Sequence, residues 1–424
     1  MTSIFHEVFA NKNVLVTSVT SLFYRTFNQL WQLWWSLYLL ELGAPILMIG
    51  FVSTLNDLSR VLLQLPGGML ADKYGRRKVI LAGTVIRTIA PLIMFFARTW
   101  QHVVPGMLLN TASIFYMPAL NATISESLPF ERRGAAFGVY RTITSSPQIF
   151  MPIISGIYIA QLGIVDGVRL GFILYEFACI AAFLIRFRYL RETLSAQEPQ
   201  ARQTAIESQD PRETASIISS MRQSLFGSRT VLTMIVVATI SGFTSRMVYP
   251  FLTIYVVNEV GLDTTQWGLL QSIFAAVSTP LFILGGVLSD KIGRVPCIML
   301  ARSIAPIEYF GILVTSSFPA LLGLFTLLGV GGGLGGGGLR GGGYQGGPAW
   351  QALIADTVPS ENRGKVMGMM ALVSGIASLP AAIIGGYVWD SINPNTLLTV
   401  GLVLGVSVIP TMALFLRAPK TRRQ

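Results

Sequence analysis

Residues 67–78, Gly-Gly-Met-Leu-Ala-Asp-Lys-Tyr-Gly-Arg-Arg-Lys, form a short charged turn between two long apolar runs. The turn is repeated at residues 285–294 as Gly-Gly-Val-Leu-Ser-Asp-Lys-Ile-Gly-Arg, where each residue is the mate of one numbered 218 lower. The same spacing carries Glu41-Leu42-Gly43 onto Glu259-Val260-Gly261. One half of the chain is therefore a duplicate of the other.

The composition indicates a membrane protein. Charged residues make up 12% of the chain, against ~25% in an average soluble domain, and 52% of the residues are hydrophobic. A single soluble core does not grow to use that much apolar surface, so we expect a polytopic membrane protein. Two cysteines, Cys179 and Cys297, lie in separate apolar segments and are expected to pack there. Two histidines are too few for a metal or acid–base cluster, so we expect no metal and no cofactor.

The apolar runs predict twelve membrane-spanning helices, because about 20 residues are needed to cross the bilayer. They are residues 14–41, 45–71, 78–97, 102–124, 134–160, 168–188, 231–258, 264–289, 295–314, 319–357, 364–388 and 394–416. This divides the chain into residues 1–189, a polar linker at 190–229, and residues 230–424. Nothing in the linker resembles a catalytic domain, so an enzyme is not expected.

Basic residues are concentrated in the connections on one side of the membrane. That side has 22 of the 31 lysines and arginines, whereas the opposite side has only Arg98 and Arg169. The positive-inside rule then predicts a plasma-membrane protein whose two termini and whose 67–78 turn are cytoplasmic. The net charge of +11 is therefore a topology signal, and we do not expect nucleic acid binding.

A second repeated turn closes the fourth and tenth segments. Residues 126–134, Glu-Ser-Leu-Pro-Phe-Glu-Arg-Arg-Gly, match residues 356–364, Asp-Thr-Val-Pro-Ser-Glu-Asn-Arg-Gly, at a spacing of 230. The extra length falls in Gly329–Gly347, where thirteen of nineteen residues are glycine. Because glycine costs ~1 kcal/mol relative to alanine inside a helix, we expect a break, bulge or loop there. No Lys-Ser or Lys-Thr follows the glycines as in a nucleotide-binding loop, so ATP drive is not expected.

The residues of both turns resemble motifs of the major facilitator superfamily. The first is Gly-x-Leu-x-Asp-x-x-Gly-Arg after the second and eighth helices, and the second is Pro-x-Glu-x-Arg-Gly after the fourth and tenth. The resemblance covers nearly the whole chain. It implies an all-α membrane fold of twelve helices in two pseudo-symmetric six-helix bundles, around a central cavity that opens alternately to each side. It also implies that helices 1, 4, 7 and 10 line the cavity.

The resemblance further implies that the motif residues form a cytoplasmic gate. They are Gly68, Asp72, Gly75, Arg76, Glu126, Glu131 and Arg133 in the first half, and Gly286, Asp290, Gly293, Arg294, Asp356, Glu361 and Arg363 in the second. By analogy with the family, Asp72 is expected to face the start of helix 11 near Gly364. Asp290 is expected to face the start of helix 5 near Gly134.

Charges inside the membrane select candidate cavity residues. Each costs roughly 2.5–3.5 kcal/mol at mid-bilayer, so it must face a partner, a wet cavity or the surface. Polar residues recur at three- and four-residue steps along helix 1, and they include Arg25, Asn28, Gln29 and Gln32. Asp57 and Arg60 do the same on helix 2, which predicts an Arg25–Asp57–Arg60 cluster. Such a cluster either couples transport to protons or only pins helix 1 to helix 2.

Arg246 on helix 7 aligns with Asn28 in the repeat, so Arg25 and Arg246 are candidate opposed cations in the cavity. The alternative for Arg246 is a pairing with a backbone carbonyl or an unassigned acid. Tyr249, Trp350 and Gln351 are further candidates for substrate contact. The remaining buried charges, which are Arg87, Glu176, Arg302 and Glu308, are expected to be structural pairs or to reach the membrane surface.

These observations predict a secondary active transporter that works by alternating access, with a small-molecule substrate and a proton or counter-solute as partners. We expect a monomer in the lipid bilayer. The preferred hypothesis is proton-coupled export of small organic molecules, with Asp57 as the protonated group. One alternative is a carrier or exchanger of organic or phosphorylated anions that uses Arg25 and Arg246. Another is a membrane sensor built on a transporter scaffold that does not transport.

Overall fold

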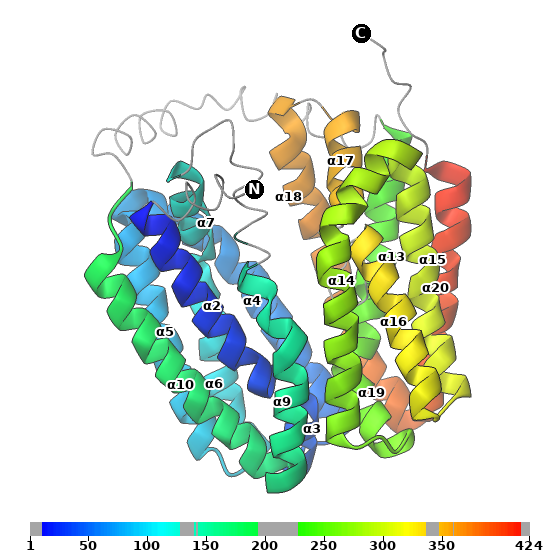
Figure 1. Ribbon diagram of the computed structural model, residues 1–424, viewed down its shortest axis with the longest axis horizontal. Coiled ribbons are helices and arrows are strands. Elements are labelled where there is room, and N and C mark those ends of the chain that lie inside the picture. Colours follow the sequence, from blue (N-terminus) through cyan, green and yellow to red (C-terminus); the bar gives the residue numbers. More distant parts are fainter. Residues whose placement is uncertain are drawn as a thin grey trace. The chain divides into compact units, whose positions relative to one another are not determined.

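The computed structural model describes residues 11–127, 140, 143–193, 228–335, 347–358 and 360–416. These residues form helices and turns and contain no strand (Figure 1). By the contacts among its own residues the chain divides into two units. The first unit comprises Met1–Pro45 and Leu55–Ser208, and the second comprises Ile46–Thr54 and Gln209–Gln424.

The first unit contains helices from the first half of the chain, with α4 only from Leu55 onward. They are α2 (Lys12–Gln32), α3 (Trp35–Glu41), α4 (Ile46–Tyr74), α5 (Arg76–Phe96), α6 (Trp100–Ala112), the 3-10 turn η1 (Ser113–Tyr116), α7 (Met117–Glu126), α9 (Pro147–Leu162) and α10 (Ile164–Tyr189). Helix α2 packs on α10, α9 and α7, and α5 packs on α6 and α10. The core at one end of this unit includes Val14, Ile80 and Leu120.

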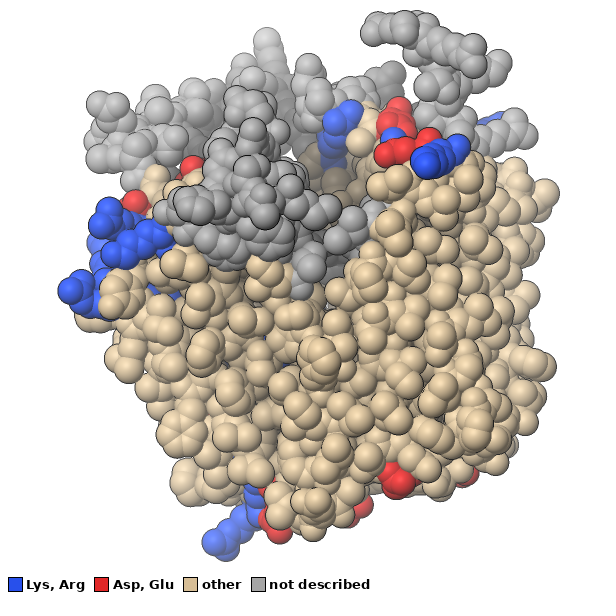
Figure 2. All heavy atoms as spheres, in the orientation of Figure 1, with Lys and Arg blue, Asp and Glu red and all other residues tan. Residues whose placement is uncertain are grey.

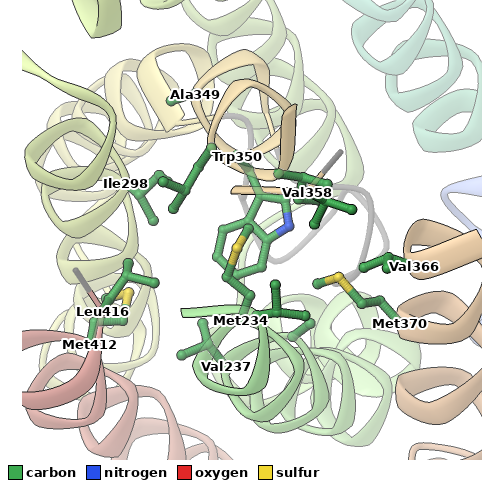
Figure 3. Close-up of a cluster of buried hydrophobic side chains, with 14 of the residues drawn as sticks. Met234, Val237, Ile298, Ala349, Trp350, Val358, Val366, Met370, Met412 and Leu416 are labelled. Carbon is green, nitrogen blue, oxygen red and sulfur yellow. The ribbon is translucent and has the colours of Figure 1, made fainter. Parts of the chain in front are cut away.

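The second unit contains helices from the second half. They are α13 (Arg229–Ile254), the π-helical turn η3 (Tyr255–Glu259), α14 (Thr264–Ile292), α15 (Arg294–Val314), α16 (Phe318–Gly335), α17 (Pro348–Thr357), α18 (Ser360–Ala377), α19 (Ala381–Ser391) and α20 (Pro394–Phe415). Helix α14 packs on α16, and α20 packs on both α13 and α15. A buried cluster that includes Met234, Ile298 and Met412 forms a core of this unit (Figure 3).

The predicted all-α membrane fold is confirmed, because every one of the twelve predicted segments contains helix. Nine helical spans of the described residues are long and apolar enough to cross a membrane. The other three predicted segments hold the α2–α3 pair, α14 and α16. Helix 1 is interrupted at Leu33–Trp34, next to its polar residues, and α18 and α19 are separated by a turn at residues 378–380.

The first nine residues of α4, Ile46–Thr54, are grouped by their contacts with the second unit, although the sequence division places them with the first half. The Thr54 hydroxyl donates a hydrogen bond to the Leu379 carbonyl oxygen over 3.1 Å. A Cβ at Gly50 would lie 2.3 Å from the carbonyl oxygen of Ala382. Close backbone packing on α19 therefore decides this grouping.

The last glycine of each charged turn adopts a backbone conformation that side chains disfavour. Gly75 has φ +92° and Gly293 has φ +100°, and each joins two long helices with no other residue between them. Glycine adopts such positive φ values at no steric cost. The two copies of the repeat thus make the same tight turn.

The first glycine of each turn allows close helix packing. A Cβ at Gly67 would lie 2.0 Å from the Phe115 carbonyl oxygen, and one at Gly285 would lie 2.6 Å from that of Leu334. A Cβ at Gly68, the glycine of the predicted gate, would meet only a Pro118 carbon at 4.0 Å. Gly67 therefore allows α4 to approach η1, and Gly285 allows α14 to approach α16.

The glycine-rich stretch begins as helix. Helix α16 continues to Gly335, residues 336–346 lie outside the described part of the chain, and α17 begins at Pro348. A Cβ at Gly333 would lie 2.4 Å from the Leu281 Cβ, so α14 occupies the space that a side chain would need. Small residues stabilise helix pairs in membranes by allowing such close approach. Packing on α14 thus offsets the low helix propensity of these glycines.

We predict that Gly67→Ala and Gly285→Ala each lower the free energy of unfolding by about 1–3 kcal/mol, because the added methyl group meets backbone that has no freedom to rotate away. Thermal unfolding of the purified protein in one detergent measures the effect. Gly323→Ala is the control, since a Cβ there meets nothing within 4 Å. Equal unfolding midpoints for the three variants would contradict the packing role of Gly67 and Gly285.

Candidate transport site

The motif arginine of the first unit pairs with an acid at the end of helix 4. Arg76 at the start of α5 forms an ion pair with Glu126 at the end of α7. The Arg76 side chain is 5% exposed and that of Glu126 is 34% exposed. Both residues belong to the predicted gate, but their pairing with each other was not predicted. The ion pair ties the charged turn to the second repeated turn.

The second unit repeats this arrangement with the mates of the same residues. Arg294 at the start of α15 pairs with Asp290 and donates from Nε to Oδ2 of Asp356 over 2.9 Å. The Asp356 side chain is 43% exposed, so this pair lies closer to solvent than Arg76–Glu126. Each half of the chain thus contains the same ion pair, between the arginine that follows the turn glycine and the acid at the end of α7 or α17.

Arg363 caps the end of α17. It donates hydrogen bonds to the carbonyl oxygens of Val358 over 3.0 Å and Ala355 over 2.6 Å. Carbonyl groups at a helix C-terminus have no partner within the helix and carry partial negative charge, so a guanidinium stabilises them. The arginine of the Pro-x-Glu-x-Arg-Gly turn therefore has a defined structural task.

Glu192 joins the charged turn, although it was not among the residues predicted for the gate. Its carboxylate oxygens accept hydrogen bonds from the backbone N–H groups of Arg76 over 3.1 Å and Arg77 over 3.0 Å, at the start of α5. An anion there matches the positive end of the helix dipole. A Cβ at Gly75 would lie 2.8 Å from Glu192 Oε2, so the glycine also makes room for the carboxylate. Nothing in the sequence distinguishes Glu192 from the other acids of the polar linker at whose start it lies.

Several predicted gate positions are not tested by these contacts. Glu131, Arg133 and Gly134 lie outside the described residues, as does the side chain of Glu361 in α18. Asp72 is exposed near the end of α4, and Gly286 lies in α14. The expected contacts of Asp72 with the start of helix 11 and of Asp290 with the start of helix 5 stay predictions.

The polar residues of helix 1 lie beside its interruption. The Asn28 amide group donates a hydrogen bond to the side-chain oxygen of Gln32, the last residue of α2. Tyr158 of α9 donates from its hydroxyl to the Leu30 carbonyl oxygen over 2.6 Å. Gln29 is half-buried and Gln32 is exposed. The break therefore presents side-chain amides at one place, with α9 stabilising the backbone next to it.

The three charges of the predicted cluster differ in exposure. Arg25 is half-buried and donates from Nη1 to the Ser145 Oγ over 3.2 Å. Asp57 is half-buried in α4, next to Asn56, whose side chain accepts a hydrogen bond from Thr111. Arg60 is exposed. The Arg25–Asp57–Arg60 cluster itself stays a prediction.

In the second unit, Arg246 is half-buried and donates from Nη1 to the Gly375 carbonyl oxygen over 3.4 Å. A backbone carbonyl was the structural alternative considered for this arginine. Tyr249 and Gln351 are both exposed. Trp350, by contrast, is 1% exposed. Figure 3 shows its indole ring among Met234, Val237 and Val358, so it packs in the core.

Two arginines of the first unit lie between hydroxyl groups and tyrosine rings. Arg87 donates to Ser113 Oγ over 2.9 Å and to the Tyr116 hydroxyl over 3.0 Å. Arg186, one of the 22 basic residues counted on the cytoplasmic side, is fully buried and donates to hydroxyl oxygens of Thr20 and Thr84. Both guanidinium groups lie 5.0–5.2 Å from the ring centroids of Tyr24 and Tyr116. Aromatic faces stabilise cations at such distances.

No group of three or more histidine, cysteine, aspartate or glutamate side chains that could hold a metal ion occurs in the described residues. Half-buried charged and amide side chains occur in the first unit on α2 and α4, and a half-buried arginine, Arg246, occurs in the second unit on α13.

Comparison with known proteins agrees with the fold. The sequence pattern described as "Major Facilitator Superfamily" matches residues 15–342. An uncharacterized MFS-type transporter of Methanocaldococcus jannaschii is 22% identical over 358 residues, covering 84% of this chain and 85% of the relative. The multi-drug resistance efflux pump PmrA of Streptococcus pneumoniae is 25% identical over 287 residues, covering 67% of each chain.

Solved structures of transporters have the same fold. The nucleoside transporter NupG superposes with a TM-score of 0.73 at 13% identity, covering 96% of this chain and 100% of the other. A D-xylose–proton symporter superposes with a TM-score of 0.70 at 15% identity, covering 97% and 99%.

We predict that Glu126→Gln lowers the free energy of unfolding by about 1–3 kcal/mol, because it removes a carboxylate from a buried guanidinium. Asp356→Asn, the same change at the repeat mate, is expected to cost less than about 1 kcal/mol, since exposed ion pairs contribute little. Unfolding midpoints of both variants in the same detergent measure the difference.

Combining each change with Arg76→Gln or Arg294→Gln gives two double-mutant cycles as controls. A larger coupling energy for Arg294–Asp356 than for Arg76–Glu126 would contradict the difference in burial.

Proposed function

This chain belongs to the major facilitator superfamily and is a multi-pass membrane transporter. We propose that it exports small organic molecules in exchange for protons. It resides in the plasma membrane with both termini cytoplasmic, and it works as a monomer and not as an enzyme. The names of the Streptococcus pneumoniae relative and of Proteus mirabilis MdtG, a multidrug resistance protein, support export.

The half-buried carboxylate of Asp57 carries the proposal. It lies near the midpoint of α4, between apolar segments, where a permanent charge is costly. Proton binding from outside removes that cost, and proton release inside restores the charge. Arg60 lies one helical turn away on the same helix.

Substrate binds next to this group in the proposal, at the amides of Asn28, Gln29 and Gln32. They lie beside the break in helix 1, where the helical ladder of hydrogen bonds is interrupted. Discontinuous helices form binding sites in many transporters because their ends offer unpaired backbone groups. Arg25 lies at the same stripe and sets the charge that a substrate meets.

We predict that Asp57→Asn abolishes transport driven by a pH gradient but leaves substrate binding within about threefold, because the amide takes up no proton. A thermal-shift screen of small organic molecules first identifies a substrate. Flux of that compound into proteoliposomes under an imposed pH gradient is then compared between variants.

Asp166→Asn is the matched control, since Asp166 is an exposed acid whose side chain is 75% exposed. Gradient-driven flux of Asp57→Asn at the rate of this control would contradict proton coupling through Asp57.

A second function, anion exchange, is favoured by the two half-buried arginines on helices 1 and 7. If Arg25 and Arg246 bind the substrate, Arg25→Gln and Arg246→Gln are each expected to weaken anion binding at least tenfold, because a charge-assisted hydrogen bond is lost. Titration of the purified protein with inorganic phosphate and with citrate measures this. The exposed Arg98→Gln variant is the control, and unchanged affinity in both test variants would contradict anion exchange.

A further inference from the structure

We propose that the outer face of α10 and the ends of α2 and α5 bind an anionic phospholipid, with its headgroup on a basic patch at the end that carries the charged turn. The basic patch consists of Lys12, Arg77, Lys78, Arg188 and Arg191. It is separate from the proposed substrate site and does not depend on which solute is transported.

Three segments of the first unit bring the basic patch together. Asn13 at the start of α2 accepts a hydrogen bond from the Arg191 N–H over 2.9 Å and donates one to the Arg191 carbonyl oxygen over 3.3 Å. At the start of α5, Arg77 donates from Nη2 to the Phe187 carbonyl oxygen over 2.8 Å. Residues distant in sequence are thereby fixed around the end of α10. Figure 2 shows lysine and arginine side chains gathered on this part of the surface.

Tyr189 lies between two of these cations. The Lys12 Nζ is 5.1 Å and the Arg188 guanidinium carbon is 5.7 Å from the centre of its ring. Lys12, Arg188 and Tyr189 are all exposed. A ring face attracts a cation but accepts few hydrogen bonds from it. Lys12 and Arg188 therefore each keep several N–H donors. Phosphate oxygens are well suited to those donors.

The charges of the basic patch are not neutralised by nearby acids in the described residues. No carboxylate there forms an ion pair with Lys12, Arg77 or Arg188. Glu192 lies beside Arg77, but its oxygens accept the backbone N–H groups of Arg76 and Arg77. The exposed side chains of Lys12 and Arg188 thus keep N–H donors for an external anion, whereas Arg77 also donates to the Phe187 carbonyl oxygen.

An apolar stripe on the same helix favours a lipid over a soluble anion. Phe177, Ile180, Leu184 and Phe187 recur at three- and four-residue steps on α10, and each is 43–66% exposed. The stripe covers eleven residues, and the ten helical steps between its ends rise about 15 Å, which is half of the ~30 Å hydrocarbon core. It ends directly at Arg188, where a phosphate group attached to acyl chains of that leaflet would lie.

The test measures binding of dioleoylphosphatidylglycerol to the purified full chain in an uncharged detergent, by native mass spectrometry, with dioleoylphosphatidylcholine as the neutral lipid. Wild type is expected to prefer the anionic lipid. The Lys12→Gln/Arg188→Gln variant is expected to lose about fivefold in affinity for each charge removed. The matched control Arg98→Gln/Lys291→Gln removes the same charge from exposed positions elsewhere and is expected to keep wild-type affinity.

Further arms identify the ligand and guard against misfolding. Glycerol phosphate at the same concentration is not expected to displace the lipid, and displacement would indicate a free-phosphate site and overturn the proposal. Lys12→Arg/Arg188→Lys keeps both charges and is expected to bind as wild type, so it replaces the double glutamine variant if that fails to fold. Loss of binding in Lys12→Arg/Arg188→Lys, equal affinity of wild type for both lipids, or equal loss in the control would each refute the proposal.

Discussion

The ion pair between the arginine of each charged turn and the acid at the end of helix 4 or 10 is the constraint on which the rest of the structure depends. It fixes the start of α5 against the end of α7, and the start of α15 against the end of α17. The glycine before the arginine makes the turn possible, and the glycine eight residues earlier lets the helices approach. The residues of each charged turn thus fix how the helices around it pack, and this arrangement occurs once in each half of the chain.

The two copies are not equally buried, and this difference has consequences. Arg76 is buried and also has Glu192 at its backbone N–H group, whereas Arg294 is paired with two acids nearer to solvent. The first turn is therefore joined to the end of helix 6 and, through residue 192, to the start of the linker. A rearrangement of the linker would act on the first turn directly through that carboxylate. In the second unit Arg363 instead stabilises the end of α17.

Much of the fold follows from the sequence because the bilayer leaves few solutions for apolar runs of this length. The twelve segments and the two tight turns depend on local composition, and the structure contains them. Contacts between side chains distant in sequence were harder to predict. Arg76 and Glu126 were both identified, but nothing in a spacing of fifty residues shows that they meet. Glu192 was missed because an acid in a polar linker has no local signal.

The burial of a side chain on a helix was also hard to predict from the sequence. Arg186 was counted among the basic residues of the cytoplasmic side, yet it is fully buried between hydroxyl groups and tyrosine rings. Trp350 was expected to contact substrate from its place after the glycine stretch, and it packs in a core cluster instead. Helical periodicity shows which residues share a face. What covers that face depends on neighbouring helices.

We propose that the two charged turns belong to a gate that opens and closes during transport. Spin labels at the repeat mates Lys73 and Lys291, both exposed, test it directly when Cys179 and Cys297 are replaced by serine. Pulsed dipolar spectroscopy of the labelled protein in nanodiscs is expected to give two distance populations whose ratio changes between pH 5 and pH 8. A single distance that is unaffected by pH and by substrate would contradict the claim.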